Sequence, residues 1–126
     1  MAMRTPLKTA RHLGSAKEGA DHFWKQRVTA VANVFLGLFL VWLLASLIGA
    51  DHAAVKSKLA NPLIALALLA LIISGTIHMR LGMQTIIEDY VHTEASKIVL
   101  LMLNTFFAAF MALAGIFAIL KLSFGA

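Results

Sequence analysis

The chain has 126 residues, of which 60% are hydrophobic and 13% are charged, and its mean hydropathy is +0.85. Soluble domains are about half apolar and about a quarter charged, so this composition excludes an ordinary soluble domain and indicates a membrane protein. The 11 Lys and Arg residues outnumber the 6 Asp and Glu residues, but no basic stripe interleaved with aromatic residues is present, which argues against nucleic-acid binding. The absence of cysteine excludes disulfides, thiolate chemistry and cysteine-held iron–sulfur clusters within this chain.

The chain begins with a basic segment, residues 1–26, which has the Arg-rich, acid-poor composition of a transit peptide. We expect it to be retained as an uncleaved cytoplasmic segment. Lys97 lies on the same side of the membrane after two crossings, and the opposite side carries only Lys56, Lys58 and Lys121. The positive-inside rule therefore predicts that the amino terminus faces the cytoplasm, or the matrix in a mitochondrion. Because we expect the basic segment to be retained, we favour a multi-pass protein of the bacterial inner membrane over one of the mitochondrial inner membrane.

The remainder of the chain, residues 27–126, is predicted to form a three-helix membrane anchor. The three hydrophobic spans each approach the roughly 20 residues that cross a hydrocarbon layer about 30 Å thick, and they cover about 28–49, 62–87 and 98–120. Asn61 is suited to cap the second helix, and Pro62 to occupy its first position, where a missing N–H costs nothing. The links between spans are short and polar, which predicts an all-α, up-down-up bundle that forms part of a larger heteromeric helix bundle.

The second span contains a histidine where hydrocarbon-facing residues are expected. On a helical wheel His78 shares one face, within about 60°, with small and polar residues: Ser74, Gly75, Gly82, Thr85 and Asp89. Ser74 and Gly82 flatten the surface beside the imidazole, so a planar group such as haem could approach and be ligated by it. Small-residue stripes also mediate helix packing, and a histidine can hydrogen-bond across such an interface. The spacing leaves both interpretations open, and a second imidazole for the iron would have to come from another chain.

Three charged or phenolic side chains near the same end also have two interpretations each. Arg80, about 200° from His78 on the wheel, either snorkels to the interface or meets a carboxylate or a partner subunit. Tyr90, about 18 Å along the axis from His78, is either an interfacial anchor or a phenol that donates to a quinone carbonyl, with Asp89 orienting it or relaying protons. Arg27 is either an interfacial residue or a partner for a carboxylate such as a haem propionate.

Positions in the other spans indicate helix packing. Asn33 and Gly37 lie one turn apart on the first span, and Asn104 is expected to form an interhelical hydrogen bond. One face of the third span carries mainly small residues: Ala108, Ala112, Gly115 and Ile119.

Two motifs in this layout are typical of a known family. The stronger one ends the second of three spans and consists of His78, Gly82-Met83 and Asp89-Tyr90-Val91; the weaker one precedes the first span and consists of Gly19, Phe23, Arg27 and Thr29-Ala30. With these motifs the chain resembles the hydrophobic membrane-anchor subunit of succinate dehydrogenase, the D subunit of succinate:quinone oxidoreductase.

The resemblance implies roles for individual residues. His78 would be an axial ligand of haem b, with the other histidine supplied by a companion membrane-anchor subunit, and Arg27 would lie near the haem propionates. Tyr90, supported by Asp89, would hydrogen-bond ubiquinone at a site shared with the companion anchor and the iron–sulfur subunit. Succinate would be oxidised in the flavoprotein subunit, so this chain would be a non-catalytic anchor of respiratory complex II.

Other functions remain open at this point. A small transporter or proton channel subunit would also place His and Asp near a span, although it should show more polar positions on the facing helices. A structural anchor without haem would keep the three spans. The chain alone does not separate succinate oxidation from the reverse reaction of fumarate reductases.

Overall fold

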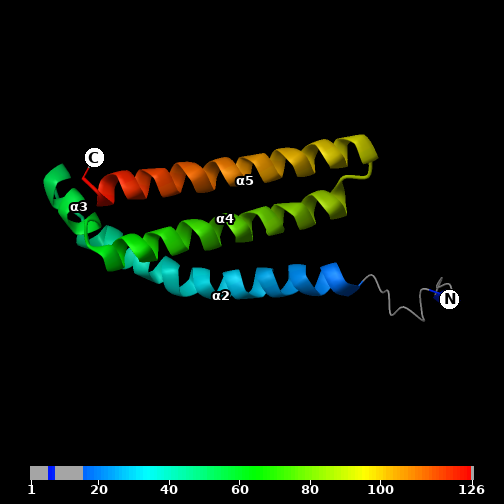
Figure 1. Ribbon diagram of the computed structural model, residues 1–126, viewed down its shortest axis with the longest axis horizontal. Helices are drawn as coiled ribbons and strands as arrows, with labels where there is room; N and C mark the ends of the chain where they lie inside the picture. The colour runs from blue at the N-terminus through cyan, green and yellow to red at the C-terminus, as the bar shows by residue number, and fades with distance from the viewer. Residues whose placement is uncertain (1–5, 8–15, 126) are drawn as a thin grey trace.

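The computed structural model describes residues 6–7 and 16–125 (Figure 1). The ordered elements in this part of the chain are four helices: α2 (Ala16–Ser46), α3 (His52–Leu59), α4 (Pro62–Tyr90) and α5 (Glu94–Ser123). Three of them, α2, α4 and α5, are long and apolar enough to cross a membrane. No strand occurs among the described residues, so the all-α prediction is confirmed.

The three long helices run antiparallel to their neighbours, and α4 lies between α2 and α5 (Figure 1). Within the described residues α4 packs against both of the other long helices, which do not pack against each other. The start of α2 and the link 91–93 lie at one end of the molecule, which we call the turn end. Helix α3 lies at the opposite end, which we call the α3 end. The short links thus produce the predicted up-down-up order.

The helices extend beyond the predicted apolar spans at most of their ends, whereas α2 stops at Ser46, before the predicted end near residue 49. Residues 1–5 and 8–15 of the predicted amino-terminal segment lie outside the described part of the chain, and from Ala16 onward that segment belongs to α2. Helix α4 begins as predicted, because the Asn61 side chain accepts a hydrogen bond of 3.0 Å from the Leu63 amide and Pro62 follows the cap. It continues to Tyr90, where the extended link begins.

The link between α2 and α4, expected as a short polar connection, instead contains helix α3. Gly49 adopts φ 77°, which lets the chain reverse after α2. Asp51 then caps α3 by accepting a hydrogen bond of 2.8 Å from the Ala54 amide. Lys56 and Lys58 lie in the last turn, where cations interact favourably with the helix dipole.

Helix α3 packs against the ends of the long helices. Leu59 is buried with Leu43 of α2 and Leu68 of α4 in a small apolar cluster. On the polar side of α3, Lys58 Nζ donates to Ser46 Oγ at 2.6 Å and lies 5.3 Å from the centre of the Trp42 ring. This end of the bundle is therefore held by apolar packing within the chain itself.

Most apolar side chains elsewhere are exposed on the isolated chain, including Phe35, Phe106, Phe110 and Phe117. Among the described residues, none has less than 2% of its surface exposed. A membrane protein covers such surface with lipid or with other subunits, because apolar side chains favour a hydrocarbon environment.

A close approach between α4 and α5 depends on Gly115. A Cβ atom added at this glycine would lie 2.9 Å from both Ile72 Cδ1 and Ile72 Cγ2, closer than packed carbon atoms normally approach. Ala108, on the same face of α5, is 5% exposed, and Ile119 packs against the apolar cluster. The predicted packing face of the third span is confirmed by these contacts.

We predict that Gly115→Leu separates α4 from α5 and lowers the stability of the solubilised protein, since overpacking costs about 1–3 kcal/mol. The measurement is the thermal unfolding midpoint of the detergent-solubilised assembly. Gly37→Leu is the matched control, because nothing lies within 4 Å of a Cβ atom at Gly37. Equal midpoints for the two variants would contradict the packing role of Gly115.

Candidate functional site

A polar seam runs between α2 and α4 toward the turn end. On α2 it contains His22, Gln26, Thr29 and Asn33, which recur every three or four residues and so share one face of the helix. Thr29 bonds across the seam to His78 and Ser74, which lie on the predicted His78 face of α4. The seam is the structural counterpart of the small and polar stripe seen in the sequence.

Thr29 and His78 form the central contact of this seam. The Thr29 hydroxyl donates to the carbonyl of Lys25 at 2.7 Å, with the carbonyl of Gln26 3.2 Å away, while Thr29 Oγ1 lies 3.1 Å from His78 Nδ1. A hydroxyl has one proton, and here it is directed at the backbone carbonyls. Thr29 Oγ1 can therefore accept from Nδ1–H of His78, and in that tautomer the ring lone pair lies on Nε2, the nitrogen then available to a metal.

The surface beside His78 is formed by small residues, as predicted. Ser74 Oγ donates to the Thr29 carbonyl at 3.3 Å, so its hydroxyl is used within the seam. Nothing lies within 4 Å of a Cβ atom at Gly75. One turn beyond His78, a Cβ atom at Gly82 would lie 3.5 Å from Gln26 Nε2.

A pocket of about 540 Å³ opens next to this seam at the turn end. Its lining comes from the start of α2 and from α4: Gly19, His22, Phe23, Gln26, Arg27, Gly82 and Thr85. The Arg27 guanidinium lies 5.0 Å from the centre of the Phe23 ring, which orients the cation at the pocket. Arg27 and Gly82, which the sequence singled out, are thus brought together.

Buried polar atoms in this region lack partners among the described residues. They are His22 Nε2, Gln26 Oε1 and, deeper along α2, Asn33 Oδ1. Because an unsatisfied buried polar atom is costly, such atoms usually mark a bound water, a ligand or a partner chain. The pocket therefore has the features of a binding site that requires another molecule.

Tyr90 and Asp89 lie apart from this pocket, at the end of α4. Both are exposed, Tyr90 to 77%, and neither forms a side-chain hydrogen bond with another described residue. Glu88, next to them, is exposed and accepts a hydrogen bond of 2.8 Å from Gln84 Nε2. Any pocket around Tyr90 must therefore be completed by atoms from outside the described chain.

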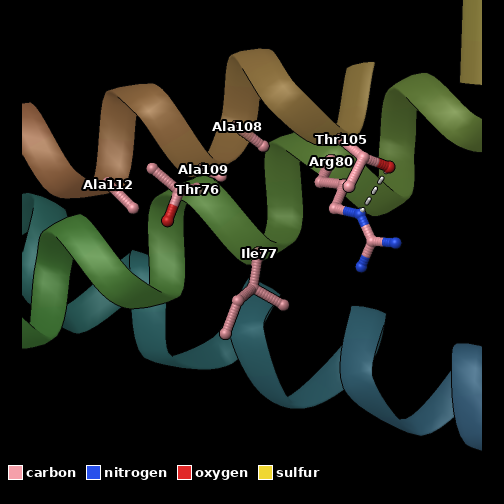
Figure 2. A pocket seen from close by; sticks show the side chains of 7 residues that line it. All are labelled: Thr76, Ile77, Arg80, Thr105, Ala108, Ala109 and Ala112. Carbon is pink, nitrogen blue, oxygen red and sulfur yellow. Dashed lines mark hydrogen bonds between the residues drawn. The ribbon is translucent and has the colours of Figure 1, made fainter. Parts of the chain in front are cut away.

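Arg80 faces α5, as its position on the helical wheel predicted, whereas His78 contacts α2. Arg80 Nε lies 3.4 Å from Thr105 Oγ1 at the edge of a second pocket (Figure 2). The backbone carbonyl of Arg80 accepts a hydrogen bond of 2.9 Å from Asn104 Nδ2, which confirms the interhelical bond expected of Asn104. Bonds of this kind average about 0.6 kcal/mol in membrane proteins.

The contacts of α2 with α4 also fix the level of Arg80 along the bundle. His78 meets Thr29, and Gly82 approaches Gln26, so Arg80 lies level with Arg27. Arg27 is the last charged residue before the uncharged stretch of α2. Arg27 therefore marks the charged edge of α2 at this level, whereas on α5 the same level lies at Asn104 and Thr105, inside the uncharged stretch that begins after Lys97.

Thr29, Gln26 and His22 were not predicted to lie opposite the His78 face of α4. Their spacing could have indicated this, because polar residues recur every three or four positions from His22 to Asn33 and so form a polar stripe on one face of the helix. No three His, Asp or Glu side chains gather as a metal cluster in the described ranges. That finding concerns free metal ions, since a haem takes a single axial ligand on each face.

The sequence comparisons identify the family. Residues 1–115 match the succinate dehydrogenase/fumarate reductase transmembrane subunit family. The chain belongs to this family. It is 31% identical over 122 residues to the succinate dehydrogenase hydrophobic membrane anchor subunit of Paracoccus denitrificans, covering 97% of this chain and 94% of the relative.

Two further relatives carry similar names. The hydrophobic membrane anchor subunit from Rickettsia bellii is 34% identical over 88 residues, which cover 70% of each chain. The membrane anchor subunit from Reclinomonas americana is 33% identical over 91 residues, covering 70% of this chain and 76% of the relative. The chain is thus a multi-pass membrane-anchor subunit of the succinate dehydrogenase type, and the predicted family is confirmed.

Proposed function

We propose that this anchor binds haem b together with a companion membrane-anchor subunit and helps to form the ubiquinone-reduction site of a succinate:quinone oxidoreductase. The observation that carries the proposal is the Thr29–His78 hydrogen bond, 3.1 Å long, which leaves His78 Nε2 as the free lone pair. A histidine oriented in this way by a second group is the usual arrangement of a metal-ligating imidazole.

The residues around His78 fit a haem. The open space at Gly75 accommodates the face of a planar ring, and the neighbouring pocket offers Arg27 to the carboxylates of the propionates. The buried His22 Nε2, which lacks a partner among the described residues, lines the same pocket. A bound haem would supply a one-electron redox centre between the two anchor subunits, and this chain would hold its iron through His78.

The exposed apolar residues at the turn end support the docking of peripheral subunits there. Met83, Ile86 and Tyr90 lie beyond the level of Arg80 and are 44%, 52% and 77% exposed. Apolar surface beside the charged end of α4, where Glu88 and Asp89 lie, favours a protein cover. We assign this cover to the iron–sulfur subunit, which carries the flavoprotein subunit, on the cytoplasmic side of a bacterial inner membrane.

Tyr90 and Asp89 are positioned for the quinone. Reduction of a quinone carbonyl requires a hydrogen-bond donor at the oxygen where negative charge develops, and a route for protons from water. The exposed phenol of Tyr90 offers the donor, and the neighbouring carboxylate of Asp89 offers the route. The rest of this pocket would come from the companion anchor and the iron–sulfur subunit.

The test of haem ligation is the His78→Leu variant of the assembled complex. We expect the reduced α-band in the absorption spectrum to disappear or shift, because leucine offers no lone pair to iron. His52→Leu, which changes an exposed histidine at the α3 end, should leave the spectrum intact. A wild-type complex without a Soret band would identify a haem-free structural anchor, and an unchanged His78→Leu spectrum would exclude His78 as the ligand.

We predict that Thr29→Val weakens haem retention by about 10- to 100-fold and raises the haem midpoint potential. The physical reason is that loss of the acceptor for Nδ1–H lowers the basicity of the imidazole and destabilises the ferric state. Thr29→Ser keeps the hydroxyl and should restore both properties. Potentiometric titration of the α-band measures the effect, and identical behaviour of the Val and Ser variants would contradict it.

Tyr90→Phe keeps the ring and removes the hydroxyl donor. We expect succinate-to-quinone electron transfer to fall by about 100-fold, while succinate oxidation by an artificial acceptor and the haem spectrum stay unchanged. Steady-state assays with both acceptors on the same preparation measure this ratio. Equal loss of both activities would indicate an assembly defect, and normal quinone reduction would make Tyr90 an interfacial anchor only.

A further inference from the structure

The cavity between α4 and α5 lies on the side of α4 away from the contact of His78 with α2. It has a volume of about 300 Å³, and Figure 2 shows Arg80 beside Thr105 of α5, with alanines farther along that helix. Neither this cavity nor Arg80 takes part in the haem and quinone chemistry proposed above.

The Arg80 guanidinium is a positive charge without a carboxylate partner among the described residues, where the recorded ion pair joins Lys25 to Asp21 on α2. The side chain is exposed, and its hydrogen bond to another described side chain is the one of 3.4 Å from Nε to Thr105 Oγ1. The Thr105 hydroxyl itself donates to the Leu101 carbonyl at 3.0 Å, so it offers Arg80 only a neutral acceptor. A guanidinium has five N–H donors, so four remain available.

The side of α4 that carries Arg80 faces an uncharged part of α5. Asn104 bonds to the Arg80 carbonyl and Thr105 to its side chain, and both lie within residues 98–120, which contain no Asp, Glu, Lys or Arg. Thr105 lies eight residues after Lys97, which is about 12 Å along a helix. An arginine beside such an apolar helix surface is costly unless it is paired. Arg80 therefore requires a partner that the described residues do not supply.

The acidic residues of this chain are badly placed to be that partner. All six lie outside the uncharged stretches of the long helices: Glu18, Asp21, Asp51, Glu88, Asp89 and Glu94. A second copy of the chain would carry its carboxylates at the same places, so it could not offer one at the depth of Thr105. A lipid phosphate lies outside the hydrocarbon layer and is also too shallow. The remaining source is a carboxylate within a membrane-spanning helix of a different subunit.

The cavity beside Arg80 has room for the side chains of such a helix. Ala108, Ala109 and Ala112 leave space beside α5 that the chain itself does not fill. Small residues in membrane helices let a neighbouring helix approach closely. Side chains three or four residues apart share one face of a helix, so a single neighbour can present a carboxylate to Arg80 and a large apolar side chain to the alanines.

We propose that Arg80 and the cavity beside it form a docking site for a membrane-spanning helix of another subunit, which places an Asp or Glu side chain at the guanidinium. The charge favours this partner, because an arginine and a carboxylate form paired hydrogen bonds that are stronger than neutral ones. The apolar surroundings favour it as well, because hydrocarbon cannot compensate an unpaired charge. The contact lies on the opposite side of α4 from His78, so it does not depend on haem or quinone binding.

A zero-length cross-link tests the proposal in membranes that contain the assembled complex. Arg80→Lys keeps the positive charge and introduces a primary amine. Dicyclohexylcarbodiimide, an apolar reagent, activates a carboxyl group, and an adjacent amine then displaces dicyclohexylurea and forms an amide bond. We expect Arg80→Lys to give a product that joins this chain to another subunit. Wild type and Arg80→Gln, which have no amine at this position, should not give that product.

Peptide mass spectrometry of the product locates the new amide bond. The expected bond joins position 80 to an Asp or Glu within an apolar stretch of another subunit. Absence of a product would overturn the proposal, and so would a bond to a carboxylate outside such a stretch, for example Glu88 or Glu94. The measurement requires neither haem nor quinone, so its failure is distinct from a failure of the function proposed above.

Retention of the cross-linked subunit by the purified complex in detergent gives a second measurement, made by native mass spectrometry. Arg80→Gln should lower this retention by about tenfold or more, because it leaves a buried carboxylate unpaired. Replacing that carboxylate by its amide in the Arg80→Gln complex should restore much of the retention, as a double-mutant cycle requires of a direct pair.

Lys97→Gln is the matched control, because it removes one positive charge from α5 outside the cavity lining. The control should retain the neighbouring subunit as wild type does. Equal retention by wild type and Arg80→Gln would overturn the proposal. Equal losses in Lys97→Gln and Arg80→Gln would also overturn it, because they would reflect the net charge of the chain.

Discussion

The hydrogen bond between the Thr29 hydroxyl and the His78 ring is the contact on which the pairing of α2 and α4 depends. A polar side chain inside a hydrocarbon layer is costly unless the protein provides its partner. Thr29 meets this requirement twice, by donating to the Lys25 carbonyl and by accepting from His78. Ser74 adds a bond to the Thr29 carbonyl. Together these bonds hold His78 against α2, at the level where the two helices present their side chains to the pocket at the turn end.

On its other side, α4 packs against α5 mainly through close steric contact. Gly115 lets α5 approach so closely that Ile72 occupies the space a Cβ atom would need, and Asn104 adds one amide bond to the α4 backbone. Steric fit of this kind tolerates little change in side-chain volume. One face of α4 thus meets α2 through polar contacts that position His78. The opposite face meets α5 through the close contact at Gly115 and the bond from Asn104 to the Arg80 carbonyl.

The parts of this arrangement that follow from helical periodicity could be predicted from the sequence. They include the face around His78, the opposite direction of Arg80, the cap at Asn61 and the bond from Asn104. The partner of His78 could not be predicted, because Thr29 lies 49 residues away and the register between helices depends on contacts along their whole length. Helix α3 was missed because its eight residues show no clear apolar period, and it depends on the Asp51 cap and on packing through Leu59. The role of Tyr90 could not be predicted either, because any pocket around its phenol would be completed by atoms of another chain.

The placement of α4 between α2 and α5 also determines how this chain responds to its surroundings. In the described part of the chain the long helices pack on one another through α4, and α3 joins their ends. Both outer helices therefore keep broad apolar faces that other molecules must cover. Substitutions on those faces would therefore weaken the binding of neighbouring subunits more than they would destabilise the helices themselves. Because binding to a folded state stabilises it by mass action, the abundance of this anchor should follow the supply of its neighbours more closely than its own rate of synthesis.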